Sequence, residues 1–497
     1  MMQTIRWQSL RRTRPADLDT PVSAFLKLRP LGANFLLETV ERGAVLGRYS
    51  FIGLHPLFEY RVASERPEIV RPGKTAVALP TAPDPLASLR AYLRSSELEG
   101  AEPDLALLAG AVGHIGYDYV RSIERLAPAR PARVDFPLAR FTIPGSLVIF
   151  DHLTRRLSVV TVACAGRGRS VTAADGIAAL LDELAADPPP RAEARLDAVL
   201  AALDRPLPAA VPRALPARQF RGEASVSPQA FAATVRQAKA HIQRGDIFQV
   251  VLSQSQVGML APDPFEVYRA LRMLNPSPYM FFLDAGLQTI VGSSPEVLVK
   301  LEQGVATVRP IAGTRPRHGD PDRDRALERE LLGDEKETAE HVMLVDLGRN
   351  DLGRVCEFGS VKATDLMTVE RYSHVMHLVS YVRGRLRADQ DCFDLLRASF
   401  PAGTVSGAPK VRAMQIIDDL EAQGRGPYAG ALGYFGIGGD MDLCITIRTI
   451  FVDRGKALLQ AGAGIVADSD PDREHQECRD KMAALERAIA TAEEGLR

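Results

Sequence analysis

Short apolar runs bounded by glycine and proline recur in the first part of the chain. They cover residues 34–60 and 105–163 and include "LVIFD" and "LSVVTVA". Runs of this length, bounded in this way, are typical of β-strands. Similar runs return at about 279–309 and 443–461. The pattern therefore predicts extensive β-sheet on both sides of the chain's midpoint.

Helical periodicity appears between these strand regions. In "SVSPQAFAATVRQAKAHIQRGD", Ser227 is a candidate N-cap and Pro228 suits the first helical position. Apolar residues then follow at helical spacing: Phe231, Val235, Ala238 and Ile242. A long charged helix is expected from about 322 to 347, and a final helix from about 471 to 493. Strands and helices in this irregular order indicate an α+β fold.

Residues 186–220 differ from the rest of the chain in their high proline and alanine content. Such a segment cannot build a sheet, although its middle could form one short helix. We interpret it as a linker between an N-terminal α+β lobe, residues 1–185, and a second domain, residues 221–497. One internal echo connects the two parts: "AGAVGHIG" at 109–116 matches "AGALGYFG" at 429–436 in its small residues. Glycine in strands allows close backbone approach, so the echo predicts two packed strands.

Charge and cysteine content narrow the class of partner. The 497 residues carry 61 Lys and Arg against 62 Asp and Glu, a net charge of −1. No overall field attracts nucleic acid or an anionic membrane, so a small-molecule partner is expected. The five cysteines form no CxxC pair, which argues against a disulfide framework or a zinc site. With no apolar secretion signal and no 18-residue apolar span, a cytoplasmic location is expected.

Two acidic motifs are the strongest chemical pattern. "ETAE" contains Glu337 and Glu340, and "EHQE" contains Glu474 and Glu477, each within an expected helix. A spacing of three residues places both carboxylates of a pair on one helix face. Two such faces turned toward each other would give the oxygen ligands that Mg²⁺ prefers, with substrate or water completing the shell. Solvated helix faces are the alternative interpretation.

Three further segments offer candidate binding groups. In "DLCITIRTIFV" the alternation of a strand places Arg448 away from the apolar face, where its guanidinium could hold a carboxylate. The glycine-rich 462–467 segment is not followed at once by a helix, which excludes a dinucleotide site, but its backbone amides could bind a small anion. His374 and His377 lie three apart, and either could act as an acid or base.

These motifs together resemble the chorismate-utilising enzymes, most closely the anthranilate synthase component I branch of that family. The N-terminal "FLLETVERGAVLGRYSFIG" extends the resemblance to the first lobe. The resemblance implies a two-lobed chorismate-binding fold with large, mostly antiparallel sheets covered by helices. The motifs between about 225 and 485 are "GDIFQVVLSQ", "NPSPYMFF", "GSSPE", "RPIAGTRPR", "EHVMLVDLGRND", "ERYSHVMHL", "PAGTVSGAPK" and "QAGAGIVADSDP".

The resemblance also implies roles for individual residues. Glu340 and Glu477 would hold Mg²⁺ against the ring carboxylate of chorismate, with Glu337 and Glu474 nearby. The residues implied to contact chorismate are Gly313, Thr314, Tyr428, Arg448, Gly462, Ala463 and Gly464, with Lys481 close by. The implied catalytic set is Glu296 as the acid for the departing hydroxyl, His377 for the later loss of pyruvate, Thr404 and Gln249.

Ala312 and Gln249 select among the reactions of this family. Enzymes resembling aminodeoxychorismate synthase carry a nucleophilic lysine where this chain has Ala312, and isochorismate and salicylate synthases carry a lysine base where it has Gln249. With neither lysine, the resemblance implies that ammonia adds to chorismate and that anthranilate and pyruvate form. Another reaction of the same family, or a non-catalytic tryptophan-sensing subunit, remains an alternative.

Regulation and nitrogen supply are also implied by the resemblance. Thr39 replaces the serine usual in the feedback site for tryptophan, whose other side would be Pro278, Tyr279 and Met280. None of the cysteines has the glycine-flanked setting of a glutaminase nucleophile, so a separate glutamine amidotransferase subunit is expected to deliver ammonia. His114 stands where an aromatic ring is more usual, and the sequence gives it no role.

Overall fold

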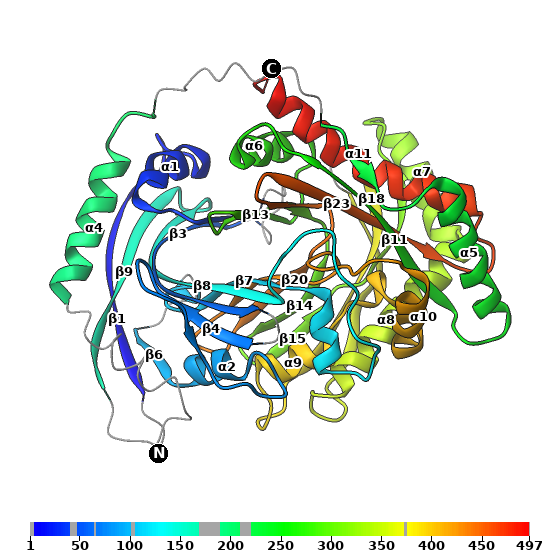
Figure 1. Ribbon diagram of the computed structural model, residues 1–497, viewed down its shortest axis with the longest axis horizontal. Helices are drawn as coiled ribbons and strands as arrows, with labels where there is room; N and C mark the ends of the chain where they lie inside the picture. Colours follow the sequence, from blue (N-terminus) through cyan, green and yellow to red (C-terminus); the bar gives the residue numbers. More distant parts are fainter. Residues whose placement is uncertain are drawn as a thin grey trace.

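Two large sheets form the body of the protein, and two long strands belong to both (Figure 1). The computed structural model describes residues 4–39, 47–63, 66–100, 105–167, 189–208, 220–371 and 375–496. The shared strands are β3 (Tyr49–Ala63) and β8 (Ala139–Asp151), which pair with each other from Tyr49↔Asp151 to Val62↔Ala139. The register of the pair shifts between Pro56 and Phe58, where β3 passes from the first sheet to the second.

The first sheet contains the Tyr49 end of β3 and the Asp151 end of β8, and further strands pair on both sides of them. All its pairings are antiparallel except that of β1 with β6. Its order is β6 (Ser96–Glu99), β1 (Ile5–Pro15), β9 (Arg156–Arg167), β8, β3, β2 (Phe35–Glu38), β12 (Tyr279–Asp284), β13 (Gln288–Ser294), β22 (Thr449–Asp453), β23 (Lys456–Ile465) and β11 (Gln249–Met259), with the short β10 (Glu223–Ala224) and β19 (Gly407–Ala408) on β11.

The second sheet continues from the other end of β3 and β8 and is antiparallel throughout. Its order is β5 (Val77–Ala78), β4 (Arg66–Val70), β3, β8, β7 (Ala111–Ile115), β20 (Ala431–Phe435), β21 (Met441–Ile445), β14 (Val297–Glu302), β15 (Val305–Val308) and β18 (Val375–Arg385), with β16 (Ile311–Pro316) and β17 (Lys362–Arg371) also on β18.

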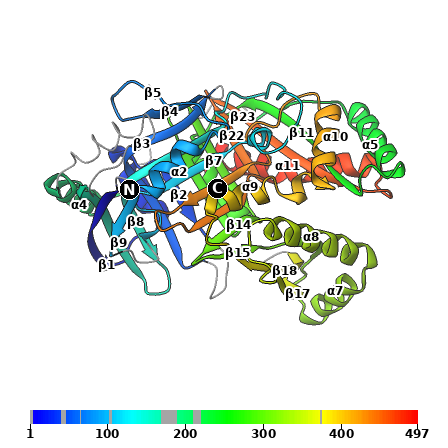
Figure 2. The same cartoon turned by 90° about the horizontal axis from the view of Figure 1, so that it is seen from below.

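Helices cover both sheets and close two hydrophobic cores. Successive residues of β12 point into different cores: Phe281 packs with residues of both sheets, whereas Met280 and Phe282 pack under the helices of the first sheet. Figure 2 shows α7 and α8 beside β17 and β18, with α5, α10 and α11 on the opposite side. The helices are α1 (Pro21–Leu28), α2 (Ala87–Arg94), α4 (Pro189–Leu203), α5 (Pro228–Gln243), α6 (Pro264–Leu274), α7 (Pro321–Gly333), α8 (Glu335–Gly353), α9 (Cys392–Ser399), α10 (Lys410–Leu420) and α11 (Pro471–Glu493).

The expected helices are present, except that one of them is divided into two. Ser227 caps α5 by accepting from the Ala230 amide, and α11 has the expected bounds. The single helix expected at 322–347 is wrong, because the chain forms α7 and α8 there. Asp334 causes the break: its carboxylate caps α8 by accepting from the Lys336 and Glu337 amides. A new helix therefore starts two residues before the first acidic motif.

The strands expected at 443–461 are present, but a bend separates the first two of them within the "DLCITIRTIFV" segment. β21 ends at Ile445 and β22 begins at Thr449, and Arg448 between them has a φ of 51°. A non-glycine residue with this φ belongs to a turn, not to a strand. Arg448 therefore lies in a bend, and the prediction that it stands on a rigid strand is wrong.

The glycine-rich echo is a strand pair, as expected. β7 and β20 pair antiparallel, with Gly113 directly opposite Gly433. A Cβ atom on Gly113 would lie 1.9 Å from the Arg140 carbonyl oxygen, and one on Gly433 would lie 2.0 Å from that of Asp442. Both positions therefore exclude a side chain, which explains why the small residues recur.

The proline-rich stretch contains the short helix that was expected within it. This helix, α4, packs against β9 and β1 of the first sheet, and Ala192, Leu196 and Val199 are buried there. Residues 186–188 and 209–219 lie outside the described part. The division of the chain at 186–220 stays a prediction, and strands from both sides of it pair in each sheet. In the described residues, no helix is long and apolar enough to cross a membrane.

Candidate active site

The two acidic motifs lie in the first turns of two capped helices. α8 begins at Glu335 and packs on β16 and β18 of the second sheet, and α11 begins at Pro471 and packs on β23 of the first. The charge of Glu477 on α11 acts on the carboxyl of Glu340 on α8. The motifs are therefore brought together where the far edges of the two sheets meet.

Glu340 is a carboxylate with a raised pKa between the two motifs. Burial raises its pKa, and the negative charges of Glu337 and Glu477 raise it further. Gln249, the first residue of β11, donates its amide to Glu340 Oε1 at 3.3 Å and opposes the rise. A cation among these carboxylates would relieve their repulsion, so the set fits a Mg²⁺ ion bound by one or two protein ligands.

Glu477 and Glu474 complete the group from α11. Lys481 donates to Glu477 Oε1 at 2.6 Å and to the Gly462 carbonyl at 2.8 Å, which joins the helix to β23. Burial raises the pKa of Glu474, and the charge of Glu477 adds to the rise. Within the described ranges, no three His, Cys, Asp or Glu side chains are already gathered around a metal position. Substrate or water would therefore have to supply most of the ligands of a metal ion.

His377 lies opposite α8 on β18. Its Nδ1 is 3.0 Å from the Gly313 carbonyl and 3.0 Å from the Thr314 hydroxyl. Because a carbonyl only accepts, Nδ1 carries the proton and Nε2 is the basic nitrogen of the neutral ring. Burial lowers the pKa of His377, and the charges of Arg309 and Arg448 lower it further. His374 lies outside the described residues.

Gly313 brings β16 close to the first acidic motif. It has a φ of +65°, and a Cβ atom there would lie 3.2 Å from Glu337 Oε2. Arg315, two residues further on, donates to Glu337 Oε1 at 3.3 Å. The "AGTR" segment thus places backbone groups beside the carboxylates, and a larger residue at Gly313 would be both strained and crowded.

Glu296 has the properties of a general acid. It lies between β13 and β14, and its carbonyl accepts from the Ile445 amide at 3.0 Å. Burial raises the pKa of its carboxyl to about 7, against the opposing effects of Thr404, Lys481 and Arg309. Thr404 Oγ1 is buried without a hydrogen-bond partner of standard geometry. Glu296, Arg309 and Thr404 line a cavity of about 50 Å³.

The glycines of β23 make room for side chains from other elements. A Cβ atom on Gly462 would lie 2.9 Å from the Tyr428 hydroxyl, and one on Gly464 would lie 2.6 Å from Gln249 Nε2. Ala463 is buried in the core under the helices, so its side chain faces away from these groups. Only the backbone of Ala463 is on the side expected to contact a substrate.

Arg448 lies close enough to Tyr428 and Glu477 for their charges to act on its guanidinium. Burial lowers its pKa, and the charges of Tyr428 and Glu477 oppose this. The structure therefore brings together the predicted residues on α8, α11, β16, β18 and β23 with Tyr428 and Arg448.

Arg425 is a supporting residue that the sequence did not reveal. Its buried guanidinium donates to the Val251 carbonyl at 2.7 Å, the Val405 carbonyl at 2.6 Å and both oxygens of Glu421. It also lies over the Tyr117 ring, 4.7 Å from the centroid. A single arginine between two glycines in "QGRGPY" carries no periodic signal. Its role depends on partners from four separate segments.

The residues expected at the tryptophan site also lie close together. Thr39 follows β2, and the preceding Glu38 pairs with Met280 of β12. Glu38 is buried and accepts from Tyr268 at 2.6 Å and from Arg272 at 2.8 Å. Tyr279 donates to Asp442 at 2.7 Å. Residues 40–46, which continue the N-terminal "FLLET" segment, lie outside the described part.

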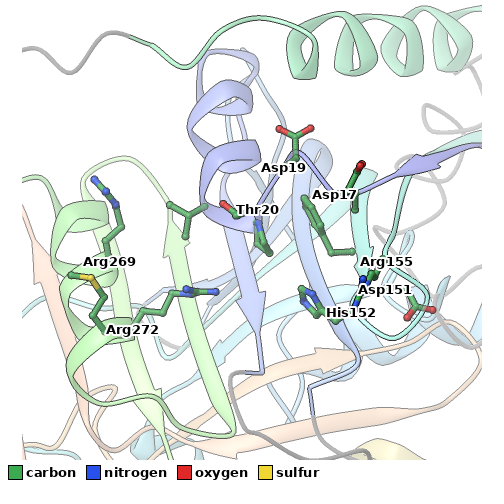
Figure 3. A pocket seen from close by; sticks show the side chains of 13 residues that line it. Asp17, Asp19, Thr20, Asp151, His152, Arg155, Arg269 and Arg272 are labelled. Atoms are coloured by element: carbon green, nitrogen blue, oxygen red, sulfur yellow. The ribbon is translucent and has the colours of Figure 1, made fainter.

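A separate pocket of about 480 Å³ lies near this strand pair, between α1, α6 and the turn after β8 (Figure 3). Arg272 lines it and also binds Glu38, and His152 lines it and also lies 2.7 Å from the Ser50 hydroxyl. No residue predicted to bind chorismate or tryptophan lines this pocket. This pocket is therefore not the predicted catalytic centre, although it is large.

Comparison with known proteins identifies the family. A family model described as chorismate binding enzyme matches residues 44–487. The chain therefore belongs to the family of chorismate-binding enzymes, as its motifs predicted.

Several named relatives are similar to this chain over most of its length. Anthranilate synthase component 1 of Acetivibrio thermocellus is 43% identical over 488 residues, covering 96% of this chain and 94% of that protein. The protein of the same name from Thermus thermophilus is 43% identical over 500 residues, covering 99% of this chain and 100% of that one. The crystal structure of anthranilate synthase component I from Streptococcus pneumoniae is 36% identical, with a TM-score of 0.76, and covers 90% of this chain and 94% of its own. The α+β fold class is thereby confirmed.

Proposed function

We propose that this chain is the large subunit of an anthranilate synthase. It would act as a Mg²⁺-dependent lyase that converts chorismate and ammonia to anthranilate and pyruvate for tryptophan biosynthesis. The main observation behind this proposal is the chemistry of Ala312 and Gln249, which lie beside the acidic motifs. Ala312 offers no nucleophile, and Gln249 donates to Glu340 instead of serving as a base. An external amine is then the group that can add to the ring. The names of the relatives support the same reaction.

The metal ion would be held by Glu340 and Glu477, with Glu337 and Glu474 at its margin. When bound, it supplies positive charge to the ring carboxylate of chorismate. Arg448 and the backbone of Gly462 to Gly464 would bind the second, enolpyruvyl carboxylate. Tyr428, Gly313 and Thr314 would fix the position of the ring.

Proton transfers would use two groups with shifted pKa values. Glu296, with a pKa of about 7, is protonated in a substantial fraction of molecules at neutral pH. It would give its proton to the C4 hydroxyl, which leaves as water while ammonia adds at C2. After the added ammonia loses a proton to water, Nε2 of His377 would take the C2 proton while the bond between C3 and the ether oxygen breaks. The enolpyruvate that leaves gains a proton at its methylene carbon and becomes pyruvate. Thr404 would keep the carboxyl of Glu296 in place, and the positive charge of Lys481 also acts on it.

Nitrogen would come from a separate glutamine amidotransferase subunit, and tryptophan would inhibit by binding near Thr39, Pro278, Tyr279 and Met280. Thiolate chemistry has no candidate among the cysteines, because all five are buried, and burial raises the pKa of Cys356, Cys392, Cys444 and Cys478.

The test is to incubate the purified chain with chorismate, Mg²⁺ and either ammonium or glutamine. Anthranilate fluorescence and pyruvate should rise together with ammonium and stay at background with glutamine alone. Isochorismate or an aminodeoxychorismate as the final product would contradict the proposed reaction. Steady anthranilate formation from glutamine without a partner would contradict the proposed source of nitrogen.

A further inference from the structure

A wide cleft is formed mostly by the first half of the chain, and none of the predicted chorismate and tryptophan residues lines it. Its volume is about 920 Å³, within the range of small-molecule sites. Four segments form it: the end of η1 (Arg29–Leu31), the middle of β3, the turn between β4 and β5, and α4, with the β12–β13 turn closing one side. Its lining residues are Leu31, Gly32, Asn34, His55, Pro56, Leu57, Glu59, Arg71, Pro72, Lys74, Arg191, Arg195, Asp284, Ala285 and Gly286.

The cleft is rich in positive charge, although the whole chain is nearly neutral. Arg191 and Arg195 are one helical turn apart on α4 and line the cleft together, facing Arg71 and Lys74 of the β4–β5 turn. Arg195 also donates to the Val162 carbonyl at 2.7 Å, which fixes part of its guanidinium. Four cationic side chains from two elements therefore converge on one space.

Two carboxylates also line the cleft, and each of them faces an arginine outside these four. Glu59 lies 3.9 Å from Arg140, and Asp284 lies 3.9 Å from Arg29. His55 adds a polar ring without charge at neutral pH, because burial and the charge of Arg195 lower its pKa.

A small chamber with a mixed polar and apolar lining adjoins the cleft. The chamber shares Asn34, Asp284 and Ala285 with the cleft and is also lined by His114 and Arg140. Three buried atoms there have no hydrogen-bond partner: Asn34 Oδ1, His114 Nε2 and Arg140 Nε. Buried polar atoms without partners are costly, and a chamber of about 20 Å³ has room for one water molecule to bond to them. His114, for which the sequence gave no role, belongs to this chamber.

We propose that this cleft binds a small phosphorylated molecule. Arginine forks and a lysine ammonium are the groups that recognise phosphate oxygens, and their number here suits the several negative charges of a pyrophosphate group. Pro56, Leu57, Pro72 and Ala285 provide apolar surface for the remainder of such a ligand. The site is separate from the chorismate centre and does not depend on which family reaction the chain catalyses.

Calorimetric titration of the full chain with inorganic pyrophosphate in metal-free buffer tests the proposal. We expect one saturable site that sulfate at equal ionic strength does not reproduce. Arg191→Gln and Arg195→Gln should each weaken binding roughly tenfold, because each removes a charge-assisted hydrogen bond. Arg236→Gln, an exposed arginine on α5, is the matched control and should bind like the wild type. Lys74→Ala, at an exposed turn, gives a second test should a helix variant fail to fold.

Four results would overturn the proposal. These are the absence of saturable binding, equal binding of sulfate, unchanged affinity in both the arginine variants and Lys74→Ala, and displacement of pyrophosphate by chorismate. The last result would place the bound anion in the chorismate centre. Thermal unfolding followed by circular dichroism confirms that each variant compared is folded.

Discussion

At the scale of single residues, the acidic motifs bring together carboxylates whose charges repel one another. Glu340 has a raised pKa because it is buried beside Glu337 and Glu477, so its ionised form is disfavoured in the folded protein. A carboxylate of this kind gains most when a cation binds. Its replacement by a neutral amide should remove metal binding while leaving the fold intact.

We therefore expect Glu340→Gln and Glu477→Gln to lower turnover by roughly a hundredfold or more through loss of the metal ligand. Glu340→Gln should not lower the Tm at neutral pH, because it removes a half-buried charge that its neighbours repel. Glu335→Gln, exposed at the start of α8, is the control and should keep full activity. Steady-state rates across a Mg²⁺ titration give the measurement, and wild-type turnover in either variant would refute the metal assignment.

Glu296 allows a prediction about pH. Its pKa of about 7 means that the proton is held below pH 7 and lost above it. If Glu296 is the acid, kcat/KM at constant free ammonia should fall as pH rises through about 7. Glu296→Gln should be much slower and lose that alkaline limb, whereas Glu302→Gln, exposed on β14, should retain it. A limb that persists unchanged in Glu296→Gln would assign the titration to another group.

The sign of the stability effect follows from the same shift. Because folding raises the pKa of Glu296, the folded state binds this proton more tightly than the unfolded chain does. Stability should therefore fall as pH rises from the ordinary carboxyl range through about 7. Glu296→Gln should reduce this dependence in thermal unfolding experiments.

At the scale of elements, the break between α7 and α8 is held by one arginine from β16. Arg315 donates to Glu330 of α7 at 2.9 Å, to the capping Asp334 at 2.8 Å and to Glu337 of α8 at 3.3 Å. A strand side chain thus fixes the angle between two helices and the start of the helix that carries the first acidic motif.

Arg315→Gln should therefore raise the KM for chorismate and the Mg²⁺ concentration needed for activity by roughly tenfold, with a smaller effect on kcat. The fold should change little, since ion pairs that are partly exposed contribute about 0–1 kcal/mol each. Arg329→Gln, on the exposed side of α7, serves as the comparison and should behave as the wild type. An equal fall in kcat with unchanged KM would show that Arg315 acts in the chemical step instead.

At the scale of the whole molecule, the expected tryptophan site draws on both halves of the chain. Thr39 follows β2 from the first half, and Tyr279 and Met280 begin β12 from the second. The next strand, β13, ends at Ser294, two residues before Glu296. Occupation of the strand pair could thus alter the catalytic centre through directly bonded strands.

We expect tryptophan to bind the wild type and Thr39→Ser alike and to raise the apparent KM for chorismate. By reciprocity, chorismate should weaken tryptophan binding by the same factor. Calorimetry with and without chorismate measures both effects. No tryptophan binding in the wild type but binding in Thr39→Ser would mean that the added methyl group of Thr39 disables the site.

The sequence alone determined the local features of this protein. Ser227 and Pro228 start α5, alternating apolar residues mark the strands, and the two ExxE motifs begin α8 and α11, because each depends on neighbours a few residues away. The eight motifs also sufficed to place the chain in its family. The capped helix start at Asp334 was missed, although Gly333 directly before it is a residue typical of helix ends.

The tertiary structure decided which of these local features meet. Arg425 binds carbonyls of two distant segments, and Gly464 is small because Gln249 passes over it. The cationic cleft forms because Arg191 and Arg195 face a turn more than a hundred residues earlier in the chain. Arg448 lies in a bend because its strand ends at Ile445, which a period of two cannot reveal. Local pattern reports the state of a backbone segment, whereas these contacts depend on long-range pairing of the two sheets.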